Sequence, residues 1–224
     1  MERHLDDAAI FRGMDGSSLA AMTSRLPAVR YPAGHVIFAD GDTADCLYIV
    51  DSGKVKICCG SQDGRQQLFT VAGPSDVFGD LSIFDPAPRS STATAMTDVQ
   101  AAQMDHDAVR RWLIERPEMT ERLLRMLAHR LRRNDDQQSE MMFTDVAGRL
   151  ARQLLELAQR FGVREGAAMR VDHGLTQEEL GQLVGATREP VNKVLMEFTR
   201  RGWIRLDGKS VLIMDSERLA RRAR

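Results

Sequence analysis

The residues best suited to chemistry lie in segment 78–90, which reads FGDLSIFDPAPRS. Gly79 allows the backbone to approach a ligand closely, and a short helical turn beginning at Leu81 would offer free N–H groups to an anion. Arg89 can close over the same anion with its forked guanidinium, and the hydroxyl of Ser90 can add a further donor. The segment therefore predicts a site for a phosphate or a similar anion.

Asp80 changes the expected ligand from a simple anion to a nucleotide. A carboxylate repels phosphate but accepts a hydrogen bond from a ribose hydroxyl, so anion donors beside one acceptor indicate a sugar–phosphate group. A simpler alternative is a surface ion pair between Arg89 and Asp85. In a third interpretation Asp80 activates water in an enzyme, but the sequence holds no metal-ligand cluster, no P-loop and no Ser-His-Asp spacing. We expect binding rather than catalysis, with no catalytic residue and no metal.

A second group of chemically suggestive residues lies in segment 175–206. Thr176 and Glu179 form a capping box that begins a helix, and Gly185 is placed to end it. Thr187 is the expected N-cap of a second helix, whose apolar residues recur at a spacing of three or four. The other face of that helix carries Arg188, Glu189, Asn192 and Lys193. This pattern is typical of a helix-turn-helix, with these four residues and Thr187 at the DNA.

Two neighbouring features fit this interpretation. Pro190 is the third residue after Thr187, where a helix has no partner for the missing N–H. Beyond the second helix, the strand-like runs 202–206 and 210–213 flank Asp207-Gly208-Lys209, and Asp-Gly between such runs favours a hairpin. The pattern predicts a winged helix-turn-helix, while an ordinary helical hairpin in a protein core is the alternative.

The phosphate segment lies within a region of short β-prone runs. Glycines interrupt residues 28–108 at near-regular intervals, which predicts a sandwich, roll or barrel. The runs are 36–38, 46–50, 55–57, 68–71 and 99–102.

Residues 118–143 are expected to form one long helix that pairs with a copy of itself. Its seam residues follow each other at spacings of 3, 4, 3, 4 and 3, as in a coiled coil. They are Leu124, Leu127, Leu131, Asn134, Gln138 and Met141. A single amphipathic helix that packs on its own domain is the alternative. Asn134 can fix the register of the pair, or it can face a polar ligand together with Asp135.

The helical pattern breaks at 143–146. Thr144 or Asp145 can cap the next helix, which an apolar stripe places at 146–161. A loop over 162–174, with a short strand at 169–171, then leads to the helix-turn-helix. The break predicts a hinge between the long helix and the DNA-reading part.

Composition limits the class of protein. The 224 residues suit one large domain or two smaller ones, and no apolar run approaches the length that spans a membrane. The acidic N-terminus has no secretory apolar segment, so we expect a cytoplasmic protein. Cys46, Cys58 and Cys59 are too few for a disulfide framework and are expected to be small buried hydrophobes.

The net charge of −1 is unevenly distributed. Residues 145–224 carry 15 Lys and Arg against 11 Asp and Glu, a charge of +4, whereas residues 1–144 carry 16 against 21, a charge of −5. The basic half is the one that holds the helix-turn-helix, as phosphate neutralisation requires. Much of its excess lies in Arg218, Arg221, Arg222 and Arg224, a cluster that equally fits a solvated helix face.

The order of these parts resembles the cyclic-AMP receptor protein (CRP/FNR) family of bacterial transcription regulators, especially its actinobacterial members. The likeness covers nearly the whole chain, through GPSDVFGDLSIFDPAPRSSTA, FTDVAGRLARQLLELAQRFG, LTQEELGQLVGATREPVNKVL and RGWIRLDGKSVLIMDSERLARRAR. It implies an α+β fold with an antiparallel, jelly-roll-like β-roll at 1–116, a dimerisation helix at 117–143 and a winged helix-turn-helix at 144–224. It also implies a homodimer with cyclic AMP as allosteric effector. The implied partners are palindromic double-stranded DNA and RNA polymerase, with no membrane.

The resemblance also assigns residues to these ligands. The phosphate-binding positions are Gly79, Leu81, Arg89 and Ser90. Asp80 stands at the ribose position, where the family usually has Glu, and Asn134 with Asp135 stands where Thr with Ser or Asn often contacts the purine. The base-reading positions are Arg188, Glu189 and Lys193, the last replacing a frequent Arg.

Two of these departures put the effector in question. Asp80 is one methylene shorter than Glu and reaches less far towards a ribose. Asp135 adds a negative charge close to its copy on the partner chain. The alternative function is therefore the same DNA-binding regulator with a degenerate or altered effector site, active without cyclic AMP or responsive to another ligand.

Overall fold

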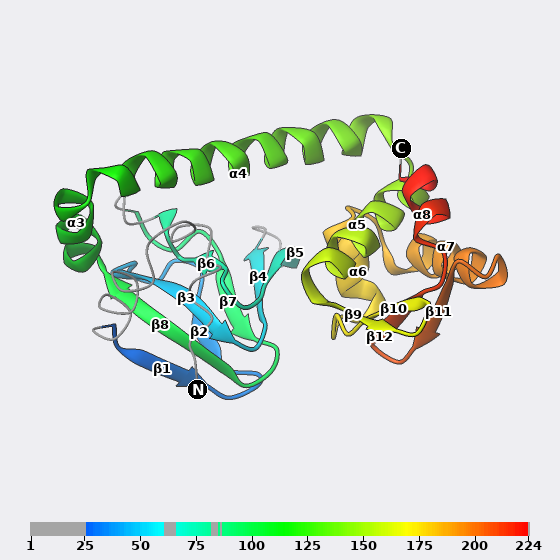
Figure 1. The fold of residues 1–224 in the computed structure, drawn as a ribbon, viewed down its shortest axis with the longest axis horizontal. Helices are drawn as coiled ribbons and strands as arrows, with labels where there is room; N and C mark the ends of the chain where they lie inside the picture. Colours follow the sequence, from blue (N-terminus) through cyan, green and yellow to red (C-terminus); the bar gives the residue numbers. More distant parts are fainter. Residues whose placement is uncertain (1–25, 61–65, 82–84, 86, 224) are drawn as a thin grey trace. The chain divides into compact units, whose positions relative to one another are not determined.

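A computed structural model describes residues 26–60, 66–81, 85 and 87–223 (Figure 1). The chain divides into two compact units, Met1–Arg132 and Arg133–Arg224. The long helix at the top of Figure 1 runs across the boundary between them.

The described part of the first unit is a roll of two four-stranded antiparallel sheets, so the predicted fold class is confirmed. The strand orders are β1-β8-β3-β6 and β2-β7-β4-β5. The strands are β1 (Ala28–Tyr31), β2 (Val36–Phe38), β3 (Cys46–Ser52), β4 (Val55–Gly60), β5 (Gln66–Ala72), β6 (Val77–Phe78), β7 (Thr92–Ala95) and β8 (Val99–Asp105).

Strand β3 separates two apolar clusters because successive side chains point to opposite faces of a sheet. Leu47 and Ile49 pack with Trp112 of helix α3 (His106–Glu115). The intervening Tyr48 lies in the other cluster, where its ring stacks on Phe78 with 5.1 Å between centroids. Phe78 immediately precedes Gly79, so this second cluster supports the start of the phosphate segment.

Helix α4 (Pro117–Phe143) confirms the predicted long helix almost to the residue. On its seam, Leu127 is half-buried against the core of the first unit. Leu124 and Leu131, however, are 61% and 63% exposed. Their exposure leaves two large apolar side chains of the seam in contact with solvent. The side chains of Asn134, Gln138 and Met141 lie outside the described set.

The second unit contains the predicted winged helix-turn-helix. Its described elements after α4 are α5 (Val146–Phe161), β9 (Gly162–Glu165), β10 (Ala168–Val171), α6 (Gln177–Leu183), α7 (Arg188–Arg200), β11 (Ile204–Asp207), β12 (Ser210–Ile213) and α8 (Ser216–Arg222). Strands β11 and β12 form the wing hairpin, and Gly208 in its two-residue turn has a φ of +60°. The order β11-β12-β10-β9 joins the wing to a second hairpin.

The expectation of a loop over 162–174 with one short strand is wrong. Residues 162–171 instead form the β9–β10 hairpin, whose turn includes Gly166 at a φ of +63°. Strand β9 is largely exposed, so it carries no apolar alternation. Its backbone pairing with β10 holds it in the sheet.

Candidate functional sites

Arg89 is the centre of the phosphate segment and is only 6% exposed. Its Nη1 donates to the carbonyl of Gly79 at 2.8 Å, and its Nη2 donates to the carbonyl of Cys46 at 2.7 Å. The guanidinium carbon lies 4.3 Å from the centroid of the Phe38 ring. The interpretation of Arg89 as half of a surface ion pair is therefore wrong. The cation is fixed by backbone carbonyls from two separate segments.

The loop that carries Arg89 is itself pinned to the β2–β3 connection. The amide of Arg89 donates to the carbonyl of Asp42 at 2.8 Å, and the amide of Gly41 donates to the carbonyl of Arg89 at 2.8 Å. Gly41 has a φ of +87°, a conformation that favours glycine. Both the main chain and the side chain of Arg89 are thus held in place by hydrogen bonds to the protein's own backbone.

Gly79 must be glycine for two independent reasons. Its φ is +73°, and a Cβ atom there would lie 2.7 Å from Nη1 of Arg89. Gly79 and Arg89, both predicted to serve the same anion, are in direct contact in the structure, while their binding of an anion stays a prediction.

The remaining residues of the phosphate segment differ in burial. Asp80 is buried, at 3% exposure, whereas Leu81 and Ser90 are exposed. The amide of Asp85 donates to the carbonyl of Leu81 at 3.1 Å. Residues 82–84 lie outside the described residues, so the predicted helical turn with its free N–H groups stays a prediction.

Cys46 is a contact of Arg89 that the sequence did not indicate. Its sulfur lies 3.7 Å from Nη2 of Arg89 and accepts from Nε2 of Gln103 at 3.2 Å. Burial raises the pKa of the thiol, which therefore stays protonated and neutral. Cys46 and Cys58 are buried and Cys59 is half-buried, as expected of small hydrophobes.

The hydrogen bond from Arg89 to the Cys46 carbonyl could not be predicted from a sequence motif. Every residue type carries a backbone carbonyl, so such an acceptor has no signature in the sequence.

Of the two side chains predicted to contact the purine, the structure describes only that of Asp135. Asp135 is exposed on α4, and the side chain of Asn134 lies outside the described residues. Their assignment to the nucleotide remains a prediction.

The capping box at the start of α6 is confirmed. The hydroxyl of Thr176 accepts from the amide of Glu179 at 3.1 Å, while the amide of Thr176 donates to Oε2 of Glu179 at 2.8 Å. After α6 the chain turns through Gly185, which has a φ of +62°. The capping box and this glycine fix where α6 begins and where the turn follows.

Thr187 occupies the N-cap position of α7, but its side chain makes no capping hydrogen bond, so this part of the expectation is wrong. An N-cap oxygen accepts from the second or third amide of the helix. The third residue here is Pro190, which has no N–H to donate. The Thr187 side chain is exposed at the start of the helix.

The recognition face of α7 is confirmed as exposed. Val191, Leu195 and Phe198 are buried on the inner side of the helix. The exposed face carries the predicted DNA-contacting residues Arg188, Glu189, Asn192 and Lys193. Nζ of Lys193 lies 2.7 Å from Oε1 of Glu189, one turn apart, so these two pair with each other in the free protein.

Gly181 sets the close approach of α6 to the turn. A Cβ atom on Gly181 would lie 2.6 Å from the carbonyl oxygen of Ala186. Alanine normally favours a helix over glycine by about 1 kcal/mol. Here we expect Gly181→Ala to lower the free energy of unfolding by about 1–3 kcal/mol, because the backbone of the turn must move.

Thermal or urea unfolding checks this prediction for Gly181. Gly60→Ala is the control, because its Cβ would meet only Oδ2 of Asp40 at 3.7 Å. An unfolding free energy for Gly181→Ala equal to or above that of the wild type would contradict the tight turn.

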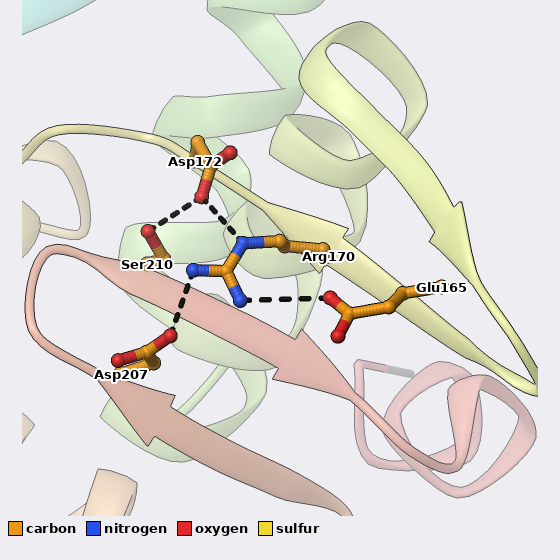
Figure 2. A network of polar contacts seen from close by, with 5 residues as sticks. All are labelled: Glu165, Arg170, Asp172, Asp207 and Ser210. Atoms are coloured by element: carbon orange, nitrogen blue, oxygen red, sulfur yellow. Dashed lines mark hydrogen bonds and ion pairs between the residues drawn. The ribbon is translucent and has the colours of Figure 1, made fainter.

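Arg170 joins the wing to the neighbouring hairpin (Figure 2). Its guanidinium lies 2.7 Å from Asp207, 3.1 Å from Asp172 and 3.5 Å from Glu165. The hydroxyl of Ser210 donates to Asp172 at 2.6 Å, which adds β12 to the network. The hydrogen bond to Asp207 is the main reason why the pKa of Arg170 is raised. One cation thus compensates three carboxylates beside the wing.

We expect Arg170→Gln to weaken DNA binding by more than the few-fold loss that one positive charge explains. The variant frees the wing turn at Asp207 and removes the cation that pairs with three carboxylates near the DNA-binding elements. Titration of duplex DNA at two salt concentrations measures the effect. Arg164→Gln, which removes an exposed charge from the same unit, is the control. Equal losses for the two variants would argue against a role of the network in placing the wing.

Neither unit shows a metal centre or a membrane span in its described part. No group of three or more His, Cys, Asp or Glu side chains there is placed to hold a metal ion. No helix among the same residues has the length and apolarity needed to cross a membrane.

Comparison with known families matches both units. Residues 28–116 match the cyclic nucleotide-binding domain, and residues 148–222 match the Crp-like helix-turn-helix domain. A cyclic nucleotide-binding domain followed by this helix-turn-helix domain defines a class of transcription regulators.

The chain belongs to the CRP/FNR family of transcription regulators. It is 59% identical over 224 residues to the CRP-like cAMP-activated global transcriptional regulator of Mycobacterium tuberculosis, covering 100% of both chains. The structure of FixK2 from Bradyrhizobium japonicum matches with a TM-score of 0.78, at 21% identity over 89% of this chain and 98% of that one. A CRP/FNR-family regulator of Thermus thermophilus matches with a TM-score of 0.73, at 26% identity over 88% and 98%. The relatives are named as regulators, so the protein is a transcription regulator rather than an enzyme.

Proposed function

We propose that this protein is a homodimeric, sequence-specific regulator whose DNA binding is controlled by cyclic AMP in the β-roll. The observation that carries this proposal is the buried Arg89, held against Gly79 within the FGDLS segment. The cAMP-activated relative in M. tuberculosis, at 59% identity, supports the choice of effector.

The phosphate of the nucleotide would bind between Arg89 and the Gly79–Leu81 backbone. A guanidinium already held by two carbonyls loses little conformational freedom on binding, so its charge-assisted hydrogen bonds to phosphate are gained at low entropic cost. Ser90 would add a hydroxyl donor. The buried carboxylate of Asp80 would accept from the ribose hydroxyl, and Asn134 with Asp135 would contact the purine.

The second candidate function is the same DNA-binding regulator with an altered or unneeded effector. Asp80 and Asp135 replace a longer and a neutral side chain at the ribose and purine positions, which favours an altered effector or a site that no longer needs one. Calorimetry with cyclic AMP and cyclic GMP, on the wild type and on Arg89→Ala, separates the two. We expect heat from cyclic AMP that the variant abolishes, whereas heat unaffected by Arg89→Ala would refute the pocket.

The DNA-binding end would work as one half of a symmetric pair. In a dimer through the exposed Leu124 and Leu131 seam, two copies of α7 can sit in successive major grooves, about 34 Å apart. Arg188 and Lys193 suit guanine edges, and Glu189 suits a cytosine amine. We therefore propose a palindrome with a G- and C-containing core in each half-site. To read bases separately, Glu189 and Lys193 must give up their mutual ion pair.

The proposal divides the chain into a nucleotide-binding roll (1–116), a dimerisation helix (117–143) and a DNA-binding domain (144–224). The hinge between the last two would pass the effect of the nucleotide to the recognition helices. RNA polymerase is the proposed further partner and the cytoplasm the proposed compartment.

Gel shift on genomic fragments at several salt concentrations tests DNA binding, because phosphate contacts make the affinity for DNA fall as salt rises. Equal weak binding to every fragment would contradict a sequence-specific regulator.

A further inference from the structure

The C-terminal helix α8 is docked on the first turns of α5, next to the predicted hinge. Leu219 of α8 is completely buried, and Ala223 at its end is 7% exposed. Nη2 of Arg152, in α5, donates to the carbonyl of Ala223 at 2.9 Å. Gly148, in the first turn of α5, also packs closely against α8, since a Cβ atom there would lie 3.2 Å from the carbonyl oxygen of Arg222. Helix α8 is therefore a packed element rather than only a solvated basic tail.

Arg222 on α8 also reaches the hinge itself. Asp145 is the N-cap of α5, and its Oδ1 accepts from the amide of Gly148 at 2.9 Å. The other carboxylate oxygen, Oδ2, is hydrogen-bonded and ion-paired to Nη2 of Arg222. The bond to Arg222, followed by the bond from Gly148, lowers the pKa of Asp145, so the carboxylate stays charged at neutral pH. One oxygen thus caps the helix while the other is held by α8.

The backbone of Asp145 shows what this contact maintains. Its φ of −70° and ψ of 168° are extended, which separates α4 from α5. If Asp145 adopted helical angles, α4 would continue towards α5, and an N-cap bond to Gly148 could not form. Any rearrangement that straightens this break must therefore release the Asp145 carboxylate from its capping position.

We propose that Arg222 is a positioning residue for the hinge, and that α8 acts through it as a brace that favours the break between α4 and α5. The inference rests on the proposed function, in which movement at this hinge places the recognition helices. The brace biases the equilibrium without touching nucleotide or DNA. Because both side chains are partly exposed, the bias is modest, of the size of a surface ion pair.

The test compares DNA affinity without nucleotide for three variants, on a fragment that the wild type binds. Arg222→Gln removes the ion pair and one positive charge. Arg221→Gln removes the same charge from the adjacent residue, whose side chain is 76% exposed and paired within α8 to Glu217 at 3.6 Å. Arg222→Lys keeps a cation that can still meet Asp145.

We expect the ligand-free DNA affinity of Arg222→Gln to differ by about two- to fivefold from that of Arg221→Gln, because the restraint on the break is weakened. The DNA affinity of Arg222→Lys should lie closer to that of the wild type. Saturating cyclic AMP should reduce the difference in DNA affinity between Arg222→Gln and Arg221→Gln. Equal ligand-free DNA affinities of the two glutamine variants would overturn the brace.

Hydrogen exchange at the Gly148 amide provides a readout independent of DNA. We expect faster exchange in Arg222→Gln than in Arg221→Gln, since the capping carboxylate is no longer held. Unchanged exchange also overturns the brace. If the wild type bound no DNA at all, the proposed function would fail, and the exchange at Gly148 alone would decide the role of Arg222.

Discussion

Arg89→Ala is expected to weaken cyclic-nucleotide binding by about a hundredfold or more. A charge-assisted hydrogen bond contributes about 1.5–3 kcal/mol, and a forked guanidinium can make two to a phosphate. The loss is large because Arg89 is buried and already oriented by the carbonyls of Gly79 and Cys46. Calorimetric titration with cyclic AMP measures it directly.

Two further variants separate binding from stability. Arg89→Lys keeps the charge but loses the fork, so we expect it to recover only part of the affinity. Arg110→Ala removes an exposed arginine from α3 and should bind like the wild type. Thermal unfolding of each variant shows whether the roll is intact. A folded Arg89→Ala protein with wild-type affinity would refute the site.

Arg188→Ala is expected to weaken binding to the preferred operator by about 5- to 150-fold and to relax base preference at one position of each half-site. The physical reason is the loss of a forked contact to a guanine edge, which is worth about 1–3 kcal/mol. Arg188 is exposed at the first position of α7, so the substitution leaves the core unchanged. Sequencing of the bound fraction from a randomised duplex measures the preference.

The control for this variant is its affinity for random DNA, where only the charge counts. We expect a few-fold loss there, similar to that of Arg164→Ala on β9. If Arg188→Ala weakened specific and random DNA equally, Arg188 would be a phosphate contact and not a base-reading residue.

Long periodic elements could be predicted closely from the sequence. Helix α5 begins at Val146 and ends at Phe161 as expected, because its apolar stripe repeats over four turns after a capping residue. Short elements with weak patterns were missed. Strand β7 reads TATA and β6 has only two residues, so neither shows a β-specific pattern. Both are held by pairing to strands far away in the chain.

Helix α3 was not predicted, and α8 was considered only as a solvated helix face, without its docking. The sequence of α8 is SERLARR, and its excess charge masks the one buried residue that docks it, Leu219. The N-caps Asp105 of α3 and Asp215 of α8 are usable signals, since each side chain accepts from an amide three residues on.

For the sites, residue types predicted the partners but not the geometry. The contact of Arg89 with Gly79 follows from the segment that carries both, whereas the Cys46 carbonyl comes from a strand 43 residues away. Pro190 also removes the third amide of α7, one of the two donors that the Thr187 hydroxyl could use, and this could be predicted from the sequence. The Glu189–Lys193 ion pair could likewise be predicted, because residues four apart lie side by side on a helix.

The most direct test of nucleotide control over DNA binding is a titration of operator DNA with the wild-type protein, with and without saturating cyclic AMP. We expect cyclic AMP to raise the affinity for the operator, and Arg89→Ala to abolish that increase while leaving the ligand-free affinity near that of the wild type. The same operator affinity in the presence and absence of cyclic AMP would contradict nucleotide control.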